Sequence, residues 1–151
     1  MRVIVTGGAP LNGETQAFVE TCFGASVHPG FGLTETCGIV SANAFEAGRL
    51  RGSCGPPVST CSVRLVSCST LCDANGRPYL ASDTMDEKGA QCWGRGEVVV
   101  AGTNLASRYF KQPAITAETF GMGPNKQREF STGDIGKCAV VRMGMETNLF
   151  A

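Results

Sequence analysis

The stretch RVIVTGGAPLNGETQAFVETCFGASVHPGFG, from Arg2 to Gly32, decides the fold that we expect for this chain. Its first five residues are mostly β-branched and predict a buried strand that ends in the sharp turn GGAP. Asn12 is a suitable N-cap for a helix, and Gly24 is a suitable C-terminal stop. The following ASVHPGFG predicts a short strand that runs into a glycine-rich loop. Strand, helix and strand in this order form a βαβ unit, and ligands of open α/β sheets bind beyond the carboxyl ends of the strands.

The expected helix has apolar residues at helical spacing. Ala17 and Phe18 lie near its middle, and Cys22 and Phe23 follow Phe18 by four and five residues. This spacing predicts an apolar helix face.

The rest of the chain predicts a β-rich part with local hairpins. Apolar and polar residues alternate from Val58 to Leu65, as in a half-buried strand. An Asn-Gly pair at 75–76 is typical of a hairpin turn, and Glu97–Ala101 predicts another strand. Pro113 is expected to open a short helix. The segment REFSTGDIGKCAVV then predicts strand, turn and strand, with TGD at the turn.

We therefore expect an α/β fold in two parts. Residues 1–45 form the βαβ part, and residues 46–151 form the β-rich part. No repeat period is visible in the sequence.

Composition restricts the class of protein. The 151 residues include 13 basic and 13 acidic side chains, so the net charge is zero. We expect no nucleic-acid partner, because such proteins carry a basic patch. No apolar run approaches the ~20 residues that span a bilayer, and the start MRVIVTGGAP lacks the apolar core of a secretory signal. We expect an intracellular protein whose eight cysteines are reduced thiols.

The GGAP turn, Gly7–Pro10, has two interpretations. Tandem glycines after a strand let the backbone approach a flat ligand and offer N–H groups to an anion. Glycine and proline are also common in any strand-to-helix turn, and this structural interpretation is the simpler one for the turn taken alone.

A second candidate is HPGFGLTETCGI, residues 28–39. Phe31 lies between two glycines and has an open aromatic face for a base. Thr34 offers a hydroxyl to phosphate, and Glu35 offers a carboxylate to Mg²⁺, which prefers oxygen ligands. The structural alternative is a core Phe31 followed by a helix that begins at Thr-Glu-Thr, with Thr34 as an acceptable N-cap.

A third candidate is the turn Thr132–Asp134. An aspartate in a turn usually caps its own backbone, and this is the default interpretation. In nucleotide sites an acidic residue can instead hold the ribose hydroxyls. His28, the only histidine, is expected to be a packed side chain rather than a base. The spacing of the residues indicates no Ser/His/Asp or Cys/His arrangement, so we do not expect catalysis by a protein nucleophile.

These motifs together resemble the adenylate-forming family of acyl- and aryl-CoA synthetases and luciferases, and most closely its long-chain fatty acyl-CoA synthetases. The resemblance begins with VTGGAPLNGETQAFVETCFGASVHPGFGLTETCG and continues with CGPPV, GEVVVAGTNLASRYFKQPAITAETF and FSTGDIGK. Ordered blocks over almost the whole chain are far more specific than any one of them.

The resemblance implies a role for each matching position. The GGAP block lines the adenine site, and the aromatic residue stacks on adenine, where Phe31 replaces the usual Tyr. Thr34 and Glu35 would contact phosphate and Mg²⁺, Asp134 would bind the ribose, and two glycines would lie near the acyl carboxylate. The implied site residues are Gly8, Ala9, Pro10, Gly30, Phe31, Gly32, Thr34, Glu35 and Asp134.

The resemblance also implies the chemistry and the partners. Such enzymes join a fatty acid to AMP, using ATP and Mg²⁺, and then transfer the acyl group to coenzyme A. The full-length protein would be intracellular, in the cytoplasm or attached peripherally to an organelle membrane of the endoplasmic reticulum or peroxisome type.

The sequence also departs from the family pattern. GGAP begins at Gly7, so we expect the phosphate loop that precedes it in the family to lie outside this chain, as does the small carboxy-terminal domain beyond Ala151. Gly144 and Met145 stand where the family hinge has Asp and Arg. Two hypotheses follow: a fragment of a fatty acid–CoA ligase that is inactive alone, or a degenerate relic that serves as a binding or interaction module.

Overall fold

The computed structural model describes residues 2–43, 49–72, 78–79, 84–85, 91–141 and 146–150. In chain order its elements are β1 (Val3–Thr6), α1 (Gly13–Phe23), β2 (Ser26–Leu33), the 3₁₀ turn η1 (Thr34–Thr36), β3 (Gly38–Ala42), β4 (Cys61–Val66), β5 (Cys68–Cys72), β6 (Pro78–Tyr79), β7 (Thr84–Met85), β8 (Gln91–Gly102), α2 (Pro113–Thr119), β9 (Phe120–Met122), β10 (Arg128–Val141) and β11 (Glu146–Phe150).

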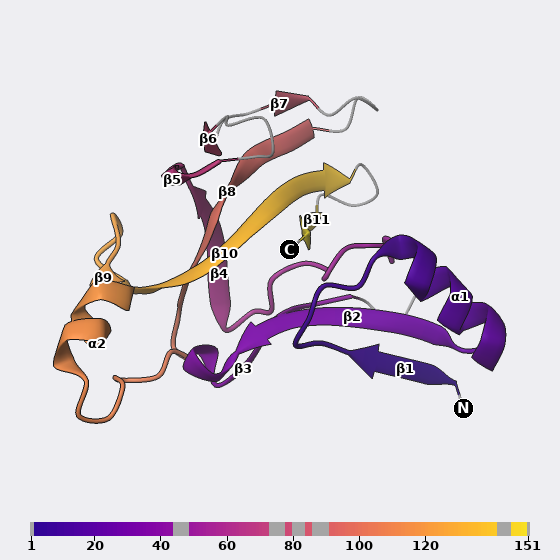
Figure 1. Ribbon diagram of the computed structural model, residues 1–151, viewed down its shortest axis with the longest axis horizontal. Coiled ribbons are helices and arrows are strands. Elements are labelled where there is room, and N and C mark those ends of the chain that lie inside the picture. Colours follow the sequence, from indigo (N-terminus) through magenta and orange to yellow (C-terminus); the bar gives the residue numbers. More distant parts are fainter. Residues whose placement is uncertain are drawn as a thin grey trace.

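The described strands form a three-stranded sheet β1-β2-β3, a six-stranded sheet around β8 and β10, and a two-stranded sheet β5-β6. Figure 1 shows β2 running along one side of the molecule with α1 beside it, β10 crossing at an angle, and α2 with β9 in a separate lobe. This mixed α/β architecture confirms the expected fold class. The boundary expected after residue 45 falls within 44–48, outside the described residues.

The βαβ unit forms as predicted. Strands β1 and β2 are parallel, and α1 connects them. The Asn12 side chain accepts a hydrogen bond of 2.7 Å from the Thr15 N–H, which satisfies a backbone donor of the first turn. Gly24 ends the helix with a φ of 58°, a left-handed conformation that glycine adopts without strain.

The burial of this unit differs from the prediction. The side chain of Val5 in β1 is 62% exposed, and Phe18 and Phe23 of α1 are also exposed. Among the described strands, β1 pairs only with β2, so it is an edge strand rather than a buried one. The helix instead buries Gln16, whose amide donates to the Val27 carbonyl over 3.0 Å. Hydrogen bonding rather than an apolar face therefore holds α1 against β2.

Strand β2 is longer than predicted. Residues 30–32 were expected in a loop, but they belong to β2 and pair antiparallel with β3. A Cβ atom at Gly32 would overlap the Gly38 carbonyl. The glycine therefore permits a close approach of two strands, which explains why a glycine-rich segment can continue the sheet.

The two larger sheets share a core. Val40 of β3 packs with Val98 and Val100 of β8, and all three are fully buried. The Val58 N–H also donates to the Val40 carbonyl over 2.9 Å. Burial of these side chains fixes β3 and its neighbour β2 against the second sheet.

The second sheet confirms several expectations. Strand β4 alternates in burial, β8 contains the predicted Glu97–Ala101, and Pro113 occupies the first turn of α2. Strands β5 and β6 are antiparallel, whereas the hairpin turn predicted at 75–76 lies outside the described residues. Residues 144–145 of the expected hinge also lie outside them.

The segment predicted as strand, turn and strand is one strand, β10. Its pairing with β8 shifts register between Ser131 and Ile135, which marks a β-bulge. Gly133 has a φ of 75° at this bulge. The prediction of a turn was therefore wrong, because the glycine produces a local kink while the ladder resumes on both sides.

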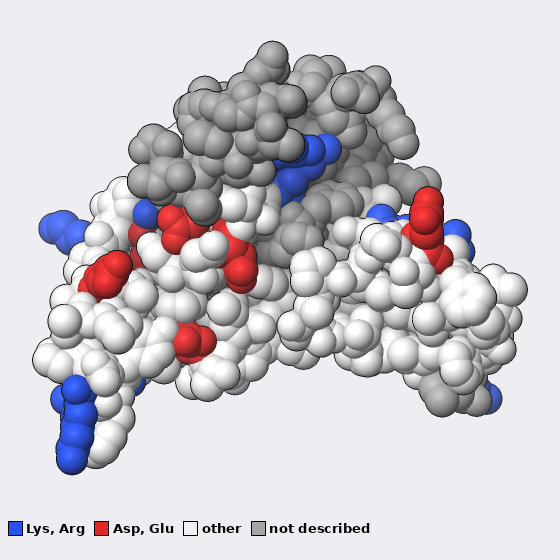
Figure 2. All heavy atoms as spheres, in the orientation of Figure 1, with Lys and Arg blue, Asp and Glu red and all other residues white. Residues whose placement is uncertain are grey.

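The described surface shows both signs of charge. On the face in Figure 2, Asp and Glu side chains are interspersed with Lys and Arg. Neither helix of the described part has the length and hydropathy of a membrane-spanning segment.

Candidate active site

Strand β2 leads directly into the tight turn η1. The Thr36 hydroxyl accepts a hydrogen bond from the Leu33 N–H over 3.0 Å and lies 2.8 Å from the Gly38 carbonyl, to which it can donate. The N-cap residue is Leu33, so the structural alternative in which Thr34 is the N-cap of a helix is wrong on this point. Thr36, which is fully buried, fixes the turn instead, and Thr34 is exposed at its start.

The side chain of Glu35 is held by a residue far away in the sequence. Its Oε1 accepts a 2.6 Å hydrogen bond from the Tyr109 hydroxyl. The Glu35 carbonyl also accepts a 2.7 Å bond from the Ala106 N–H. The hydrogen bond to Glu35 is the main cause that raises the pKa of Tyr109, so the phenol stays protonated and keeps donating at neutral pH. One carboxylate oxygen is thus oriented before any ligand binds.

Asn104 attaches the same turn to the end of β8. Its amide donates to the Thr36 carbonyl over 2.9 Å. Its Oδ1 is buried and makes no hydrogen bond within the described part of the chain. Sequence reasoning did not single out Asn104 or Tyr109, although polar residues that directly follow a buried strand are a usable signal.

Phe31 lies where β2 passes the core. It is partly buried and packs against the cluster of Val40, Val98 and Val100. This position agrees with the structural alternative of a core phenylalanine. The residue is not fully buried, and a stacking role stays a prediction.

The GGAP segment lies beside the same strand. A Cβ atom at Gly7 would be 3.1 Å from the Gly30 carbonyl oxygen, so the two backbones are close. Gly8 has a φ of 85°, and Gly8, Ala9 and Pro10 are exposed. The fold therefore brings the GGAP segment next to the glycines of β2, as the βαβ prediction requires.

Asp134 lies apart from these residues, at the bulge of β10. The hydroxyl of Thr132 accepts a 3.1 Å bond from the Asp134 N–H and donates to the Val98 carbonyl over 2.8 Å. Thr132, and not the aspartate, therefore caps this backbone, which corrects the default interpretation. Within the described residues the Asp134 carboxylate has no hydrogen bond or ion pair, and partial burial raises its pKa. No contact there links Asp134 to Glu35.

The residues of this site could bind Mg²⁺ only if other ligands completed its coordination. The described part of the chain contains no group of three His, Cys, Asp or Glu that could hold a metal. Glu35 offers one oxygen that does not bind Tyr109. Mg²⁺ is commonly bound by one or two carboxylates together with substrate phosphates and water, so Glu35 fits as one ligand of a phosphate-bound ion.

His28 has the structural role that was predicted. It is 3% exposed, and its Nε2 lies 2.8 Å from the Ser26 hydroxyl. The imidazole of this β2 residue is buried, so it is not accessible to a substrate.

The chain is similar to known proteins along most of its length. The family model described as AMP-binding enzyme matches residues 1–110. Long chain acyl-CoA synthetase 8 of Arabidopsis thaliana is 34% identical over 137 residues, which cover 91% of this chain and 17% of that protein. Fatty acyl-CoA synthetase A of Dictyostelium discoideum is 33% identical, with 91% and 18% covered.

A solved structure gives the same fold. The ATP-bound RpMatB-BxBclM chimera B3 superposes with a TM-score of 0.69 at 25% identity, and the match covers 99% of this chain and 25% of that one. The chain thus spans less than a fifth of the curated relatives it matches.

Proposed function

Because the chain belongs to the AMP-binding enzyme family, we propose that it is part of a long-chain fatty acid–CoA ligase. The complete enzyme would activate a fatty acid with ATP to an acyl-adenylate and then transfer the acyl group to coenzyme A. Long-chain and fatty acyl-CoA synthetases among the relatives support this substrate class. We also propose an intracellular location, with peripheral attachment of the full-length protein to an organelle membrane.

The observation that carries the proposal is the oriented carboxylate of Glu35. A carboxylate that binds Mg²⁺ beside a phosphate must have a fixed orientation. At least one of its oxygens must also be free of hydrogen bonds to the protein. Tyr109 holds one oxygen of Glu35 over 2.6 Å, and the Thr36 hydroxyl fixes the turn that carries it. Such preorganisation lowers the reorganisation needed when charge has to be stabilised.

The other predicted residues surround a nucleotide in this proposal. Residues 1–45 supply the contacts to adenine and phosphate, and residues 46–151 supply the ribose carboxylate. Phe31 would stack on adenine, and Thr34 would contact phosphate. Asp134 would accept hydrogen bonds from the ribose hydroxyls. The backbone of the GGAP segment would line the base, through Gly8, Ala9 and Pro10.

The proposed chemistry needs no protein nucleophile. The fatty acid carboxylate attacks the α-phosphate, pyrophosphate leaves, and the coenzyme A thiol later displaces AMP. A bound Mg²⁺ would supply charge neutralisation at the phosphates, and Glu35 would be its protein ligand. The chain itself contributes positioning, and the backbone of Gly30 and Gly32 in β2 would lie near the acyl carboxylate.

Isothermal titration of the chain with AMP and with ATP·Mg²⁺ tests the proposal. We expect weak binding of AMP, in the millimolar range, because the chain spans less than a fifth of its relatives. Asp134→Asn should weaken this binding about tenfold, since it removes a charged acceptor from the ribose. Glu118→Gln is the matched control, because this exposed helix residue loses the same charge away from the site. Equal affinities of the two variants would contradict the assignment of Asp134.

A relic without catalytic function is the second candidate. Gly144 and Met145, which replace the charged pair of the family hinge, favour it. A relic that serves as an interaction module should fold but bind neither nucleotide. A complete lack of AMP binding by a folded chain would therefore support the relic against the ligase.

A further inference from the structure

A pocket lies in the lobe of α2 and β9, and its lining includes Tyr109, the residue whose hydroxyl binds Glu35. It has a volume of about 610 Å³ and is lined by residues of the 108–113 segment, α2, β9 and the start of β10. Small-molecule sites commonly have volumes of about 300–1,000 Å³. None of the site residues predicted from the sequence lines this pocket.

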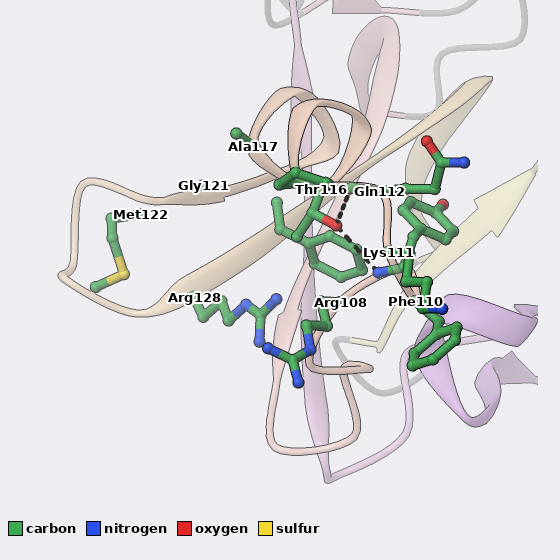
Figure 3. Close-up of a pocket in the computed structure, with 12 residues that line it drawn as sticks. Arg108, Phe110, Lys111, Gln112, Thr116, Ala117, Gly121, Met122 and Arg128 are labelled. Carbon is green, nitrogen blue, oxygen red and sulfur yellow. Dashed lines mark hydrogen bonds between the residues drawn. The ribbon is translucent and has the colours of Figure 1, made fainter.

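Three basic side chains line the pocket: Arg108, Lys111 and Arg128. None of them forms an ion pair within the described residues, and no described Asp or Glu lines the pocket. Figure 3 shows Arg108 and Arg128 extending toward the same part of the pocket. Like charges gathered without a carboxylate repel one another, and an anionic ligand would relieve this repulsion.

The two arginines differ in how they are held. Arg128 lies over the ring of Phe120, with its guanidinium 4.6 Å from the ring centroid, and it donates to the Ser107 carbonyl. Arg108 makes no hydrogen bond within the described part of the chain and is exposed. Arg128 is therefore already placed, whereas Arg108 keeps all its donors for a ligand.

The remaining wall of the pocket is largely apolar. Phe120 forms part of it, and Phe110 and Met122 are 80% and 70% exposed. Exposed apolar side chains of this size on one lobe are unfavourable in water and suit a ligand with an apolar body.

We propose that this pocket binds a free phosphomonoester with an apolar body, held at its phosphate by Arg108, Lys111 and Arg128. Planar guanidinium groups bind phosphate oxygens in pairs, and a phosphomonoester carries nearly two negative charges at neutral pH. A monocarboxylate would leave more of the positive charge unbalanced.

Titration of the 151-residue chain with octyl phosphate, below its micelle-forming concentration, tests the proposal. We expect binding in the micromolar to millimolar range, weakened at least about tenfold in Arg108→Gln and further in Arg108→Gln/Arg128→Gln. Arg108→Gln is the decisive variant, because its side chain makes no internal hydrogen bond whose loss could unfold the lobe. Inorganic phosphate should bind more weakly than octyl phosphate, since it lacks the apolar body.

Arg2→Gln/Arg95→Gln is the matched control for the double variant. Both side chains are exposed and do not line the pocket, so the change in net charge is the same. The proposal is overturned if wild type does not bind octyl phosphate, or if the control weakens binding as much as the double variant. Binding to phosphatidic acid vesicles without binding of octyl phosphate would overturn it as well, because it would indicate a membrane surface.

The same variants distinguish AMP binding in this pocket from AMP binding at the proposed nucleotide site. AMP is itself a phosphomonoester with a flat base, so it could enter either place. AMP binding that depends on Asp134 but not on Arg108 supports the nucleotide site. AMP binding that depends on Arg108 alone would contradict the proposed function and support binding in this pocket.

Discussion

The turn η1 and the bulge of β10 each carry an acidic residue predicted for the nucleotide site, and the fold treats them differently. In the turn, Glu35 accepts a hydrogen bond from Tyr109, which is 74 positions away in the sequence. At the bulge, Asp134 has a capped backbone, but its carboxylate has no partner in the described residues.

This difference concerns preorganisation. A motif places a carboxylate at a bend of the chain, whereas a distant partner decides whether that carboxylate has one orientation. Glu35 has already lost rotamer freedom on folding, so a ligand would not have to fix it again. Asp134 would have to be ordered by its ligand. We therefore expect substitutions in and next to the turn to lower the stability of the protein more than substitutions at the bulge.

The largest expected difference is between two glycines: Gly32, in β2 just before the turn η1, and Gly133, at the bulge of β10. In Gly32→Ala the new methyl group would overlap the backbone of Gly38, so we expect a loss of about 3 kcal/mol in the free energy of unfolding. In Gly133→Ala nothing lies within 4 Å of the new atom, and only the φ of 75° is unfavourable, which should cost about 1 kcal/mol. Urea unfolding of both variants measures the difference. Equal losses would mean that the strand leading into the turn is no more tightly packed than the bulge.

The next comparison uses the two threonines that cap these bends. Thr36→Val removes a fully buried hydroxyl and leaves the Leu33 N–H without its acceptor, so we expect a loss of about 2 kcal/mol. Thr132→Val removes the partner of the Asp134 N–H at a partly exposed position that water can reach, and about 1 kcal/mol should be lost. Thermal unfolding of the pair gives the ranking. The reverse order would contradict the view that η1 depends on its internal hydroxyl.

The smallest effect is expected from the contact that distinguishes Glu35. Tyr109→Phe removes one hydrogen bond and should cost about 1 kcal/mol at neutral pH. Because the folded protein raises the pKa of Tyr109, the stability gained from this group is complete below the ordinary tyrosine pKa near 10. It is lost as the pH rises through the higher pKa of the folded state.

Urea unfolding of wild type and Tyr109→Phe between neutral pH and strongly alkaline pH measures this contribution. The advantage of wild type should be constant at first and should shrink above about pH 10. An advantage that grew in alkali would show that the phenol does not donate to Glu35.

Much of the fold could be predicted from local signals. Asn12, Gly24 and Pro113 act through their own backbone positions, so α1 and α2 begin or end where the sequence predicts. The alternation in β4 was visible for the same reason, because side chains on successive strand residues point to opposite faces.

The errors occurred where strand pairing decides the structure. The glycines of β2 were taken for a loop because glycine is rare in strands, but β3 approaches so closely that only glycine fits at position 32. The Thr-Gly-Asp segment was taken for a turn, but β8 pairs with both of its flanks. The β-propensity of a segment does not show which strand will pair with it.

The sequence by itself determined the α/β class, the helix limits and the residues that are candidates for the nucleotide site. Only the tertiary structure decided that Tyr109 orients Glu35, that the Asp134 carboxylate has no partner among the described residues, and that Arg108 and Arg128 share a pocket. The physical reason is distance along the chain. Capping and periodicity act between residues a few positions apart, whereas a hydrogen bond or a pocket between distant residues exists only after the sheets have packed.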